Sequence, residues 1–246
     1  MLSVFSKFNF ISLIALLLVS CGQQNKTLRV EARIDSELLK SIKSNYYLEP
    51  YDLLVISSYG GDELAAIEIR KFLSENKIRV AADKYCLSSC AMHILLPLTN
   101  STINNDTLVA LHPSAASFDN EHFLTKIEPS FAKKIRKISN SVNNYDNFDA
   151  RGLYNYSLGA MMPTCTKDAN NPVSFNSRYN FWIPNEDVLR KYGVRINGYW
   201  PSDFETAQKL VLKYMQPNLA WAYGLSELEF LSDDSVSNYL SRIPKC

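Results

Sequence analysis

Apolar and polar residues between residues 28 and 113 follow a pattern that predicts strands separated by helices. The first strand alternates apolar and polar side chains, as a half-buried strand does, and the second is a continuous apolar run typical of a strand buried on both faces. The expected strands are residues 28–34, 53–56, 78–82 and 108–111. The expected helices, which have one apolar face or are wholly apolar, are residues 35–44, 63–76 and 88–96. This order predicts right-handed βαβ units and a mostly parallel sheet.

Beyond residue 113 the pattern becomes mainly helical. The expected helices begin at residue 129 or 130 and lie at 150–162, 184–192 and 204–214, with a mostly helical end over 218–246. Residues 99–106 and 164–177 are polar and are expected to be loops, and residues 194–196 are expected to form a strand. The whole pattern predicts an α/β domain over residues 28–198 and a helical C-terminal extension over residues 199–246.

Residues 1–21 have the features of an export signal and not of a folded domain. An apolar run over residues 8–19 is too short to span a membrane comfortably. It ends in Leu18-Val19-Ser20-Cys21-Gly22, which resembles the signal of bacterial lipoproteins, although a plain secretory signal is the alternative. The resemblance implies a lipid anchor at Cys21 on the periplasmic side of the bacterial cell envelope, and Gly22 is typical of an outer-membrane address. Residues 22–27 are expected to be a polar tether.

The net charge bears on the kind of partner, and the cysteine content bears on disulfides and metal binding. The 246 residues carry a formal net charge of +1, which gives no electrostatic reason to expect a nucleic-acid partner. Beyond Cys21 the number of cysteines is even, which favours disulfides in an oxidising compartment. The disulfide candidates are Cys86, Cys90, Cys165 and Cys246, and sequence alone does not choose among their pairings. Cys86, Cys90 and His93 could share a helix face and bind zinc, but no fourth ligand is evident, so no metal is predicted.

Three motifs supply the residue types that acyl transfer requires. They are Ser58-Tyr59-Gly60-Gly61 after a strand, Ser88-Ser89 at the start of an apolar helix, and His112 after the next strand. A serine nucleophile needs a base to accept its proton, and backbone N–H groups must stabilise the oxyanion. The first turn of a helix offers such N–H groups, and a glycine pair allows close backbone approach to a substrate. The alternatives are a helix cap for Ser88 and a nucleophile at Ser89. His93 and His122 are expected to be core and surface residues.

In the order of these motifs the chain resembles the ClpP/crotonase superfamily, and most of all its periplasmic ClpP-like members. That branch carries Ser-x-Gly-Gly after a strand and Cys-x-Ser-x-Cys at a buried helix, which matches Cys86, Ser88 and Cys90 here. The resemblance covers roughly residues 28–196. It implies that Ser88 is the nucleophile and His112 the general base, and that the N–H groups of Gly61 and Ser89 form the oxyanion hole.

The third member of the expected triad departs from this family. The Clp proteolytic subunit has an aspartate ahead of a Tyr-Gly-Leu-like ending, and Lys191-Tyr192-Gly193-Val194 matches that ending. Counting back places Asn180 or Phe181 where the aspartate would be. Because an asparagine can orient a catalytic histidine, Asn180 is the candidate orienting residue, and a Ser–His dyad is the alternative.

The sequence therefore predicts a lipid-anchored serine hydrolase, most simply a ClpP-like peptidase, with a peptide or protein substrate and no cofactor. The resemblance also makes a homo-oligomer a possible assembly. The alternative from another class is a catalytically inactive ClpP-like lipoprotein that serves as a binding scaffold. A thioesterase or another acyl hydrolase is a further alternative, because one fold hosts many chemistries.

Overall fold

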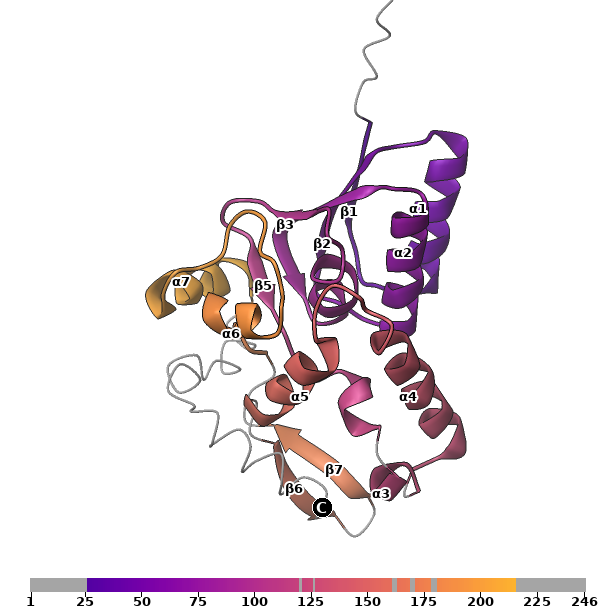
Figure 1. Cartoon of the computed structure of the whole chain (residues 1–246), viewed down its shortest axis with the longest axis vertical. Helices are drawn as coiled ribbons and strands as arrows, with labels where there is room; N and C mark the ends of the chain where they lie inside the picture. The colour runs from indigo at the N-terminus through magenta and orange to yellow at the C-terminus, as the bar shows by residue number, and fades with distance from the viewer. Residues whose placement is uncertain are drawn as a thin grey trace, which may run out of the picture.

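The computed structural model describes residues 26–119, 121–125, 127–160, 163–168, 171–177 and 181–215 (Figure 1). The centre of the fold is a five-stranded sheet in which every pairing is parallel. Its strands are β1 (Thr27–Glu31), β2 (Leu53–Ser58), β3 (Arg79–Leu87), β4 (Ser101–Ile103) and β5 (Leu108–Ala110). The strands β1, β2 and β3 lie in this order, and β4 and β5 both pair with β3. The predicted α/β fold with a mostly parallel sheet is therefore confirmed.

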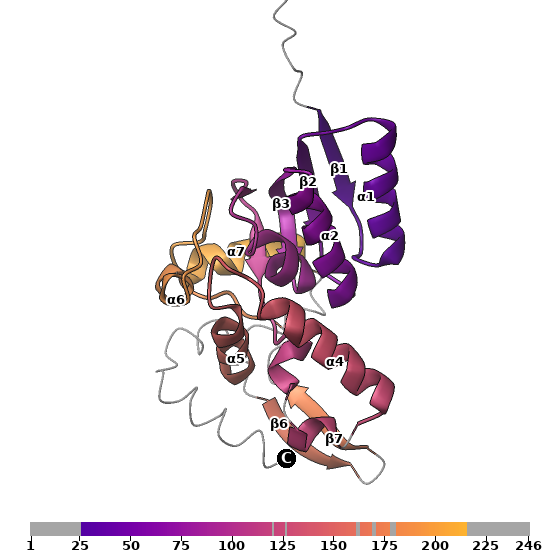
Figure 2. The same cartoon turned by 45° about the vertical axis from the view of Figure 1, so that its right-hand side comes forward.

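Two helices, α1 (Ser36–Leu48) and α2 (Glu63–Glu75), lie side by side against this sheet (Figure 1 and Figure 2). Each begins where the sequence predicts, because the carboxylates of Asp35 and Asp62 accept hydrogen bonds from backbone N–H groups of the first turn. The helix α1 continues past its predicted end, since the ring of Tyr46 packs edge-on against Phe72 of α2, with 5.4 Å between ring centroids. Most buried residues of α2 recur at helical spacing, and the whole set is Ala65, Ala66, Ile67, Ile69, Phe72 and Leu73.

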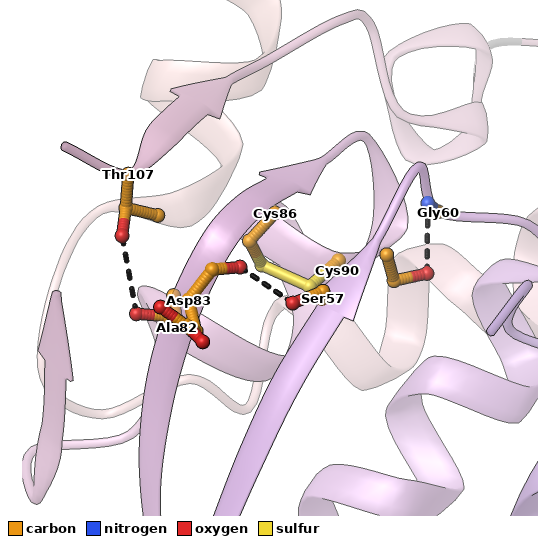
Figure 3. The surroundings of a disulfide bond; sticks show 8 residues. Ser57, Gly60, Ala82, Asp83, Cys86, Cys90 and Thr107 are labelled. Carbon is orange, nitrogen blue, oxygen red and sulfur yellow. Dashed lines mark hydrogen bonds between the residues drawn. A yellow bond between two sulfur atoms is a disulfide. The ribbon is translucent and has the colours of Figure 1, made fainter. Parts of the chain in front are cut away.

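The strand β3 contains a bulge between its two halves. Between two of its pairs with β2, β3 advances by four residues, from Ala82 to Cys86, where β2 advances by two. The Ser57 hydroxyl donates to the Asp83 carbonyl (2.7 Å) and the Thr107 hydroxyl to the Ala82 carbonyl (3.3 Å), so side chains satisfy the irregular backbone (Figure 3). Before the bulge β3 pairs with β4, and after it with β5. The bulge therefore places β5 beside the end of β3.

The remaining described elements surround the sheet. They are a π-helix η1 (Cys90–Leu95), a 3-10 helix η2 (Ala115–Phe118), α3 (Glu121–Leu124), α4 (Pro129–Val142), α5 (Ala150–Ala160), β6 (Pro163–Asp168), β7 (Asn171–Ser177), α6 (Glu186–Lys191) and α7 (Phe204–Tyr214). The strands β6 and β7 form an antiparallel hairpin at the end of the molecule opposite the start of β1 (Figure 1 and Figure 2).

The two faces of β3 and β5 contact different helices. Leu87 and Leu108 belong to a cluster with Leu210 and Val211 of α7, whereas Cys86 and Val109 face the main core with α2 and η1. Successive side chains of a strand point to opposite faces, so α7 and α2 cover opposite sides of the sheet. The part of the predicted C-terminal extension that the structure describes is thus packed on the sheet.

Three predictions of local structure are wrong. Residues 99–106 are not only a loop, because β4 lies within them and pairs with β3. Within residues 164–177, predicted as a loop, residues 164–168 and 171–177 belong to the paired strands β6 and β7, in which backbone pairing outweighs polar composition. Residues 194–196 contain no strand, since the chain makes a single bridge between Gly198 and Ile103 instead. A Cβ at Gly198 would lie 2.2 Å from the Ile103 carbonyl oxygen, so only a residue without a side chain allows this approach.

The predicted signal with Cys21 and the chain end with Cys246 lie outside the described residues. Within the part of the chain that the structure describes, no helix has the length and apolar character needed to cross a membrane.

Candidate active site

The carboxyl ends of three parallel strands bring the sequence motifs together. Leu87 at the end of β3 pairs with Ala110 of β5, so the residues that follow these strands leave the sheet at one edge. These residues include Ser88 and His112. Cys86 of β3 pairs with Ser58 of β2, so the glycine turn after β2 begins at the same edge.

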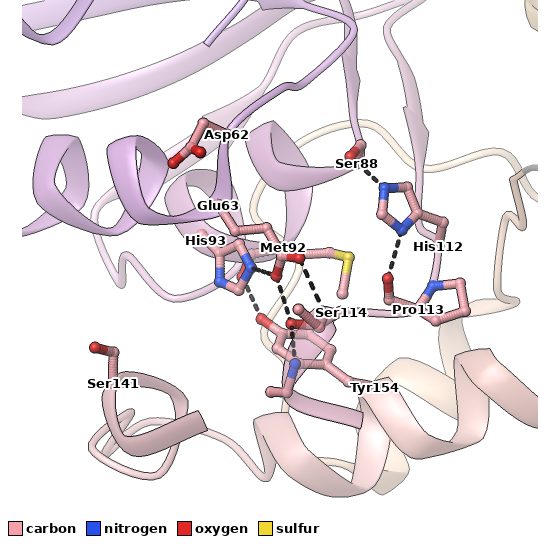
Figure 4. A network of polar contacts seen from close by, with 12 residues as sticks. Asp62, Glu63, Ser88, Met92, His93, His112, Pro113, Ser114, Ser141 and Tyr154 are labelled. Atoms are coloured by element: carbon pink, nitrogen blue, oxygen red, sulfur yellow. Dashed lines mark hydrogen bonds and ion pairs between the residues drawn. The ribbon is translucent and has the colours of Figure 1, made fainter. Parts of the chain in front are cut away.

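Ser88 and His112 are in direct contact (Figure 4). The Ser88 Oγ lies 2.5 Å from His112 Nε2, and His112 Nδ1 lies 2.6 Å from the carbonyl oxygen of Pro113. Because a carbonyl oxygen only accepts, Nδ1 carries the proton and Nε2 is the acceptor for the Ser88 hydroxyl. In this tautomer an imidazole can remove the proton of a serine hydroxyl.

The backbone of Ser88 has a positive φ of 56°. This left-handed conformation costs a residue other than glycine roughly 1 kcal/mol, so neighbouring contacts must hold it. The Ser88 N–H donates to the Ala110 carbonyl (3.0 Å), and the Ser88 carbonyl accepts from the Met92 N–H (2.9 Å). A disulfide between Cys86 and Cys90 closes around the same turn (Figure 3). The turn that presents Ser88 is thus held from both sides.

The helix that follows Ser88 is a π-helix and not the expected α-helix. Its wider turn is seen in the hydrogen bond from the Leu96 N–H to the Ala91 carbonyl, which are five residues apart (3.0 Å). The Tyr154 hydroxyl donates to the Met92 carbonyl, so a side chain from α5 binds a carbonyl of this helix. Helices of this kind are rare and occur frequently at functional sites.

The Gly60-Gly61 turn is held by the segment after β1. The Ile34 N–H donates to the Gly60 carbonyl (3.0 Å), and the Asp62 N–H donates to the Ile34 carbonyl (2.8 Å). These two bonds form a parallel bridge between Ile34 and Gly61, and the N–H of Gly61 itself takes no part in it. Ser89 is the residue directly before η1. N–H groups at the start of a helix lack partners within the helix, and the N–H of Ser89 is one of them. The glycine turn lies beside Ser88, because a Cβ at Gly60 would lie 2.5 Å from the Ser88 Cβ.

His112 is held in its neutral form. Burial lowers the pKa of His112, because a charged imidazolium would lose its solvation, and the nearby His93 acts in the same direction. The Pro113 carbonyl and the Glu63 carboxylate raise the pKa, but burial outweighs them. A neutral imidazole at neutral pH is the form that a general base requires.

The sequence did not point to a partly buried carboxylate close to this pair, that of Glu63. It opens α2 and accepts three hydrogen bonds: from the Ser114 hydroxyl (2.5 Å), from His93 Nε2 (2.6 Å) and from the Ala115 N–H (2.9 Å) (Figure 4). His93 is fully buried, as expected of a core residue, but it has a polar partner. The only signal for Glu63 in the sequence is an acidic residue in the first turn of a helix, which the helix dipole favours in any protein.

The contacts of Glu63 should make the stability of the fold sensitive to acid. Burial alone would raise its pKa, but the contacts with His93, Ser114 and Ala115 outweigh burial and lower the pKa from 4.5 to about 2. Because the folded-state pKa is depressed, the ionised carboxylate stabilises the fold fully above about pH 4.5, and this contribution is lost as the pH falls towards 2. We expect the unfolding free energy, measured with urea at successive pH values, to fall less steeply over this range in Glu63→Gln than in wild type. An equally steep fall in the variant would contradict this assignment.

Four other residues that the sequence singles out either lie outside the described part of the chain or have side chains that the structure does not describe. Asn180 and Cys246 lie outside the described residues, and nothing is described of the Cys165 and His122 side chains. The neighbour of Asn180, Phe181, places its ring 5.9 Å from the His112 ring between centroids. The disulfide uses both thiols that the zinc alternative needs, so Cys86 and Cys90 are not thiolate ligands in this structure.

Comparison with known proteins adds distant likenesses only. No protein-family model matches the chain, and no curated protein matches it. Among solved structures, a point mutant of ClpP1 from Listeria monocytogenes aligns over 74% of this chain and 95% of its own, at 11% sequence identity and a TM-score of 0.45. ClpP1 from Listeria monocytogenes aligns over 74% of this chain and 94% of its own, at 13% identity and a TM-score of 0.39. At these values the function has to be argued from the residues of the chain itself.

Proposed function

We propose that this chain is a serine hydrolase in which Ser88 is the nucleophile and His112 the general base. The observation that carries the proposal is the 2.5 Å contact between Ser88 Oγ and His112 Nε2, with Nδ1 held by the Pro113 carbonyl. A serine that only caps a helix would direct its hydroxyl at a backbone N–H of the first turn, whereas the Ser88 hydroxyl is directed at an imidazole. The resemblance in sequence motifs makes a ClpP-like peptidase, with a peptide or protein substrate, the most specific form of the proposal.

The proposed reaction begins when Ser88 Oγ attacks the carbonyl carbon of an acyl substrate. A bond forms between Oγ and that carbon, the hydroxyl proton passes to His112 Nε2, and the carbonyl oxygen becomes an oxyanion. The N–H groups of Gly61 and Ser89 would donate to that oxygen. The intermediate then collapses, and His112 returns the proton to the leaving group, so that an acyl-enzyme remains for water to hydrolyse. In this scheme the Pro113 carbonyl orients His112, and Asn180 remains a prediction for the same task.

We also propose that the chain is anchored by lipid at Cys21 in the bacterial cell envelope, on the periplasmic side and at the outer membrane. The apolar run over residues 8–19 and the segment around Cys21 support this proposal. The disulfide between Cys86 and Cys90 is an independent support, because such bonds persist in oxidising compartments and are rare in the cytosol.

A fluorophosphonate probe tests the proposed nucleophile. Attack by Ser88 Oγ on phosphorus would expel fluoride and leave a stable adduct, so we expect mass spectrometry to find the label on the peptide that contains Ser88. The variant Ser88→Ala should lose the label entirely. The matched control is Ser141→Ala in α4, because that hydroxyl donates to the Lys137 carbonyl and not to a histidine.

Absence of label from folded, disulfide-intact protein would exclude the enzyme and leave the binding scaffold as the function. Label on Ser89 in place of Ser88 would keep the reaction class but change the nucleophile. The Ser89 hydroxyl is buried and has no hydrogen-bond partner among the described residues, so the expected site is Ser88.

A further inference from the structure

We propose that Glu63 is the positioning residue for the base, and that it acts on His112 through the Ser114-Ala115 backbone. The proposal rests on the proposed function, because a base has a position to maintain only if Ser88 reacts. It assigns to α2 the carboxylate that the sequence motifs fail to supply at Asn180. Glu63 does not touch Ser88, so it is not itself a catalytic residue.

The first support is the segment that Glu63 binds. The Ser114 hydroxyl donates to Glu63 Oε2 (2.5 Å), and the Ala115 N–H donates to Oε1 (2.9 Å). These two residues follow Pro113, whose carbonyl accepts from His112 Nδ1 (2.6 Å). The carboxylate therefore holds the stretch of chain that carries both the imidazole and its acceptor. Without this hold, the Pro113 carbonyl could rotate away, and Nδ1 would lose the contact that keeps Nε2 free to accept a proton.

The second support is that Glu63 is itself held. His93 Nε2 lies 2.6 Å from Glu63 Oε2, and His93 Nδ1 lies 3.0 Å from the Tyr145 hydroxyl (Figure 4 shows the contact between His93 and Glu63). The Arg70 guanidinium lies over the Tyr145 ring, 4.5 Å from its centroid. A carboxylate with donors on both oxygens and a supported imidazole has little freedom to turn. This chain of contacts links Tyr145 and His93 in the core, through Glu63, to the segment that follows His112.

The third support is electrostatic, and it distinguishes a positioning role of Glu63 from a purely structural role in packing. The titratable groups that act on His112 are Glu63 of α2, which raises its pKa, and His93 of η1, which lowers it. Glu63 in turn faces His93 and acts on the buried Tyr145 and Tyr154 hydroxyls. Glu63→Gln removes the charge, so the pKa of His112 should fall further below its ordinary value. A change that only loosened the core would not move that pKa in a defined direction.

The experiment compares Glu63→Gln with Glu63→Asp, and uses Glu68→Gln as the matched control. Glu68 lies on the same helix, and its side chain is partly exposed and pairs with Lys71. The readout is the second-order rate constant of fluorophosphonate labelling as a function of pH. In wild type this rate constant should rise with pH as His112 loses its proton (the ascending limb) and then reach a plateau. In Glu63→Gln we expect the plateau value to be about 10²-fold lower, as for a misplaced catalytic group, and the rise to occur at lower pH than in wild type. In Glu63→Asp the retained charge should keep the limb at the wild-type pH, while the shorter side chain lowers the plateau. Glu68→Gln should match wild type.

A Glu63→Gln variant with the wild-type plateau and the wild-type limb would overturn the proposal. If that variant does not fold, as judged by circular dichroism, Ser114→Ala replaces it, since this change removes only one of the three hydrogen bonds to Glu63. We expect its plateau to fall about 10-fold with an unmoved limb, and an unchanged plateau would overturn the proposal.

A second readout distinguishes failure of this proposal from failure of the proposed function. The chain has three histidines, so NMR titration can follow the His112 ring directly, with His112→Ala as the assignment. If wild-type protein takes no label, the proposed function fails, and a role for Glu63 in catalysis fails with it. A His112 pKa that still falls in Glu63→Gln would then mark the contact as structural coupling only. Label on wild type, together with a wild-type plateau and an unmoved His112 pKa in Glu63→Gln, would overturn the positioning role alone.

Discussion

Replacing His112 with alanine is expected to slow fluorophosphonate labelling of Ser88 by about 10³-fold, within the range that general-base catalysis supplies. The hydroxyl of an isolated serine is a weak nucleophile, and His112 Nε2 is the group that lies 2.5 Å from Ser88 Oγ to accept its proton. The free energy of unfolding should change much less in proportion, because each of the two side-chain hydrogen bonds that are lost contributes only about 1 kcal/mol to the folded state. The rate is measured by stopped-time labelling at a pH above the pKa of His112.

The control for this prediction is chemical rescue. Added imidazole should restore part of the labelling in His112→Ala, because the vacated space lies beside the Ser88 hydroxyl. It should restore none in Ser88→Ala, which lacks the nucleophile. Labelling of His112→Ala at the wild-type rate would show that the reactivity of Ser88 is independent of the imidazole, and the proposed base would have to be abandoned.

The meeting of Ser88 with His112 was expected from the resemblance in sequence motifs, and the places of the two residues along the chain agree with it. Ser88 directly follows β3 and His112 comes two residues after β5, and neighbouring parallel strands end at one edge of a sheet. The start of α2 was equally predictable, since Asp62 has the side chain that caps a first turn. The start of α2 needs only the period of the apolar residues and the chemistry of one polar side chain, whereas the pairing of Ser88 with His112 was expected from the resemblance.

The support behind His112 could not be anticipated, because it depends on contacts between distant segments. Glu63 and Ser114 are 51 residues apart, and nothing in either local pattern points to the other. Nor does any sequence motif show that the Pro113 carbonyl, one residue away, accepts from His112 Nδ1. The disulfide shows the same limit, since four cysteines allow three full pairings and only the folded turn brings Cys86 and Cys90 together.

Nor could the local conformation of the backbone be predicted from the sequence. The bulge in β3 arises where strands of different length are paired, and a period of two along the chain does not reveal it. The positive φ of Ser88 is sustained by the bonds to Ala110 and Met92, and so it follows from tertiary contacts and not from an intrinsic preference of serine.

Gly60→Ala is expected to damage both the site and the fold, and Gly193→Ala provides its matched control. Gly60 has φ of 92° and Gly193 has φ of 81°, so both substitutions carry the cost of a left-handed side chain, about 1 kcal/mol. At Gly193 a new Cβ would meet its nearest neighbour, the Phe148 Cα, at an ordinary 3.5 Å. At Gly60 it would lie 2.5 Å from the Ser88 Cβ, 2.7 Å from the Leu87 carbonyl oxygen and 2.8 Å from the Ser88 Oγ.

The clash at Gly60 therefore falls on the nucleophile and on the carbonyl group that precedes it. We expect Gly193→Ala to lower the unfolding free energy by about 1 kcal/mol and to keep the wild-type labelling rate. Gly60→Ala should lower it by about 3 kcal/mol, the range of overpacked sites, and should slow labelling by at least about 10²-fold, since Ser88 Oγ must move from His112 Nε2. Urea unfolding and labelling rates on the same preparations separate the two effects. Wild-type labelling of a destabilised Gly60→Ala protein would mean that Ser88 reacts from a position other than the one beside His112, because the two side chains cannot share the space.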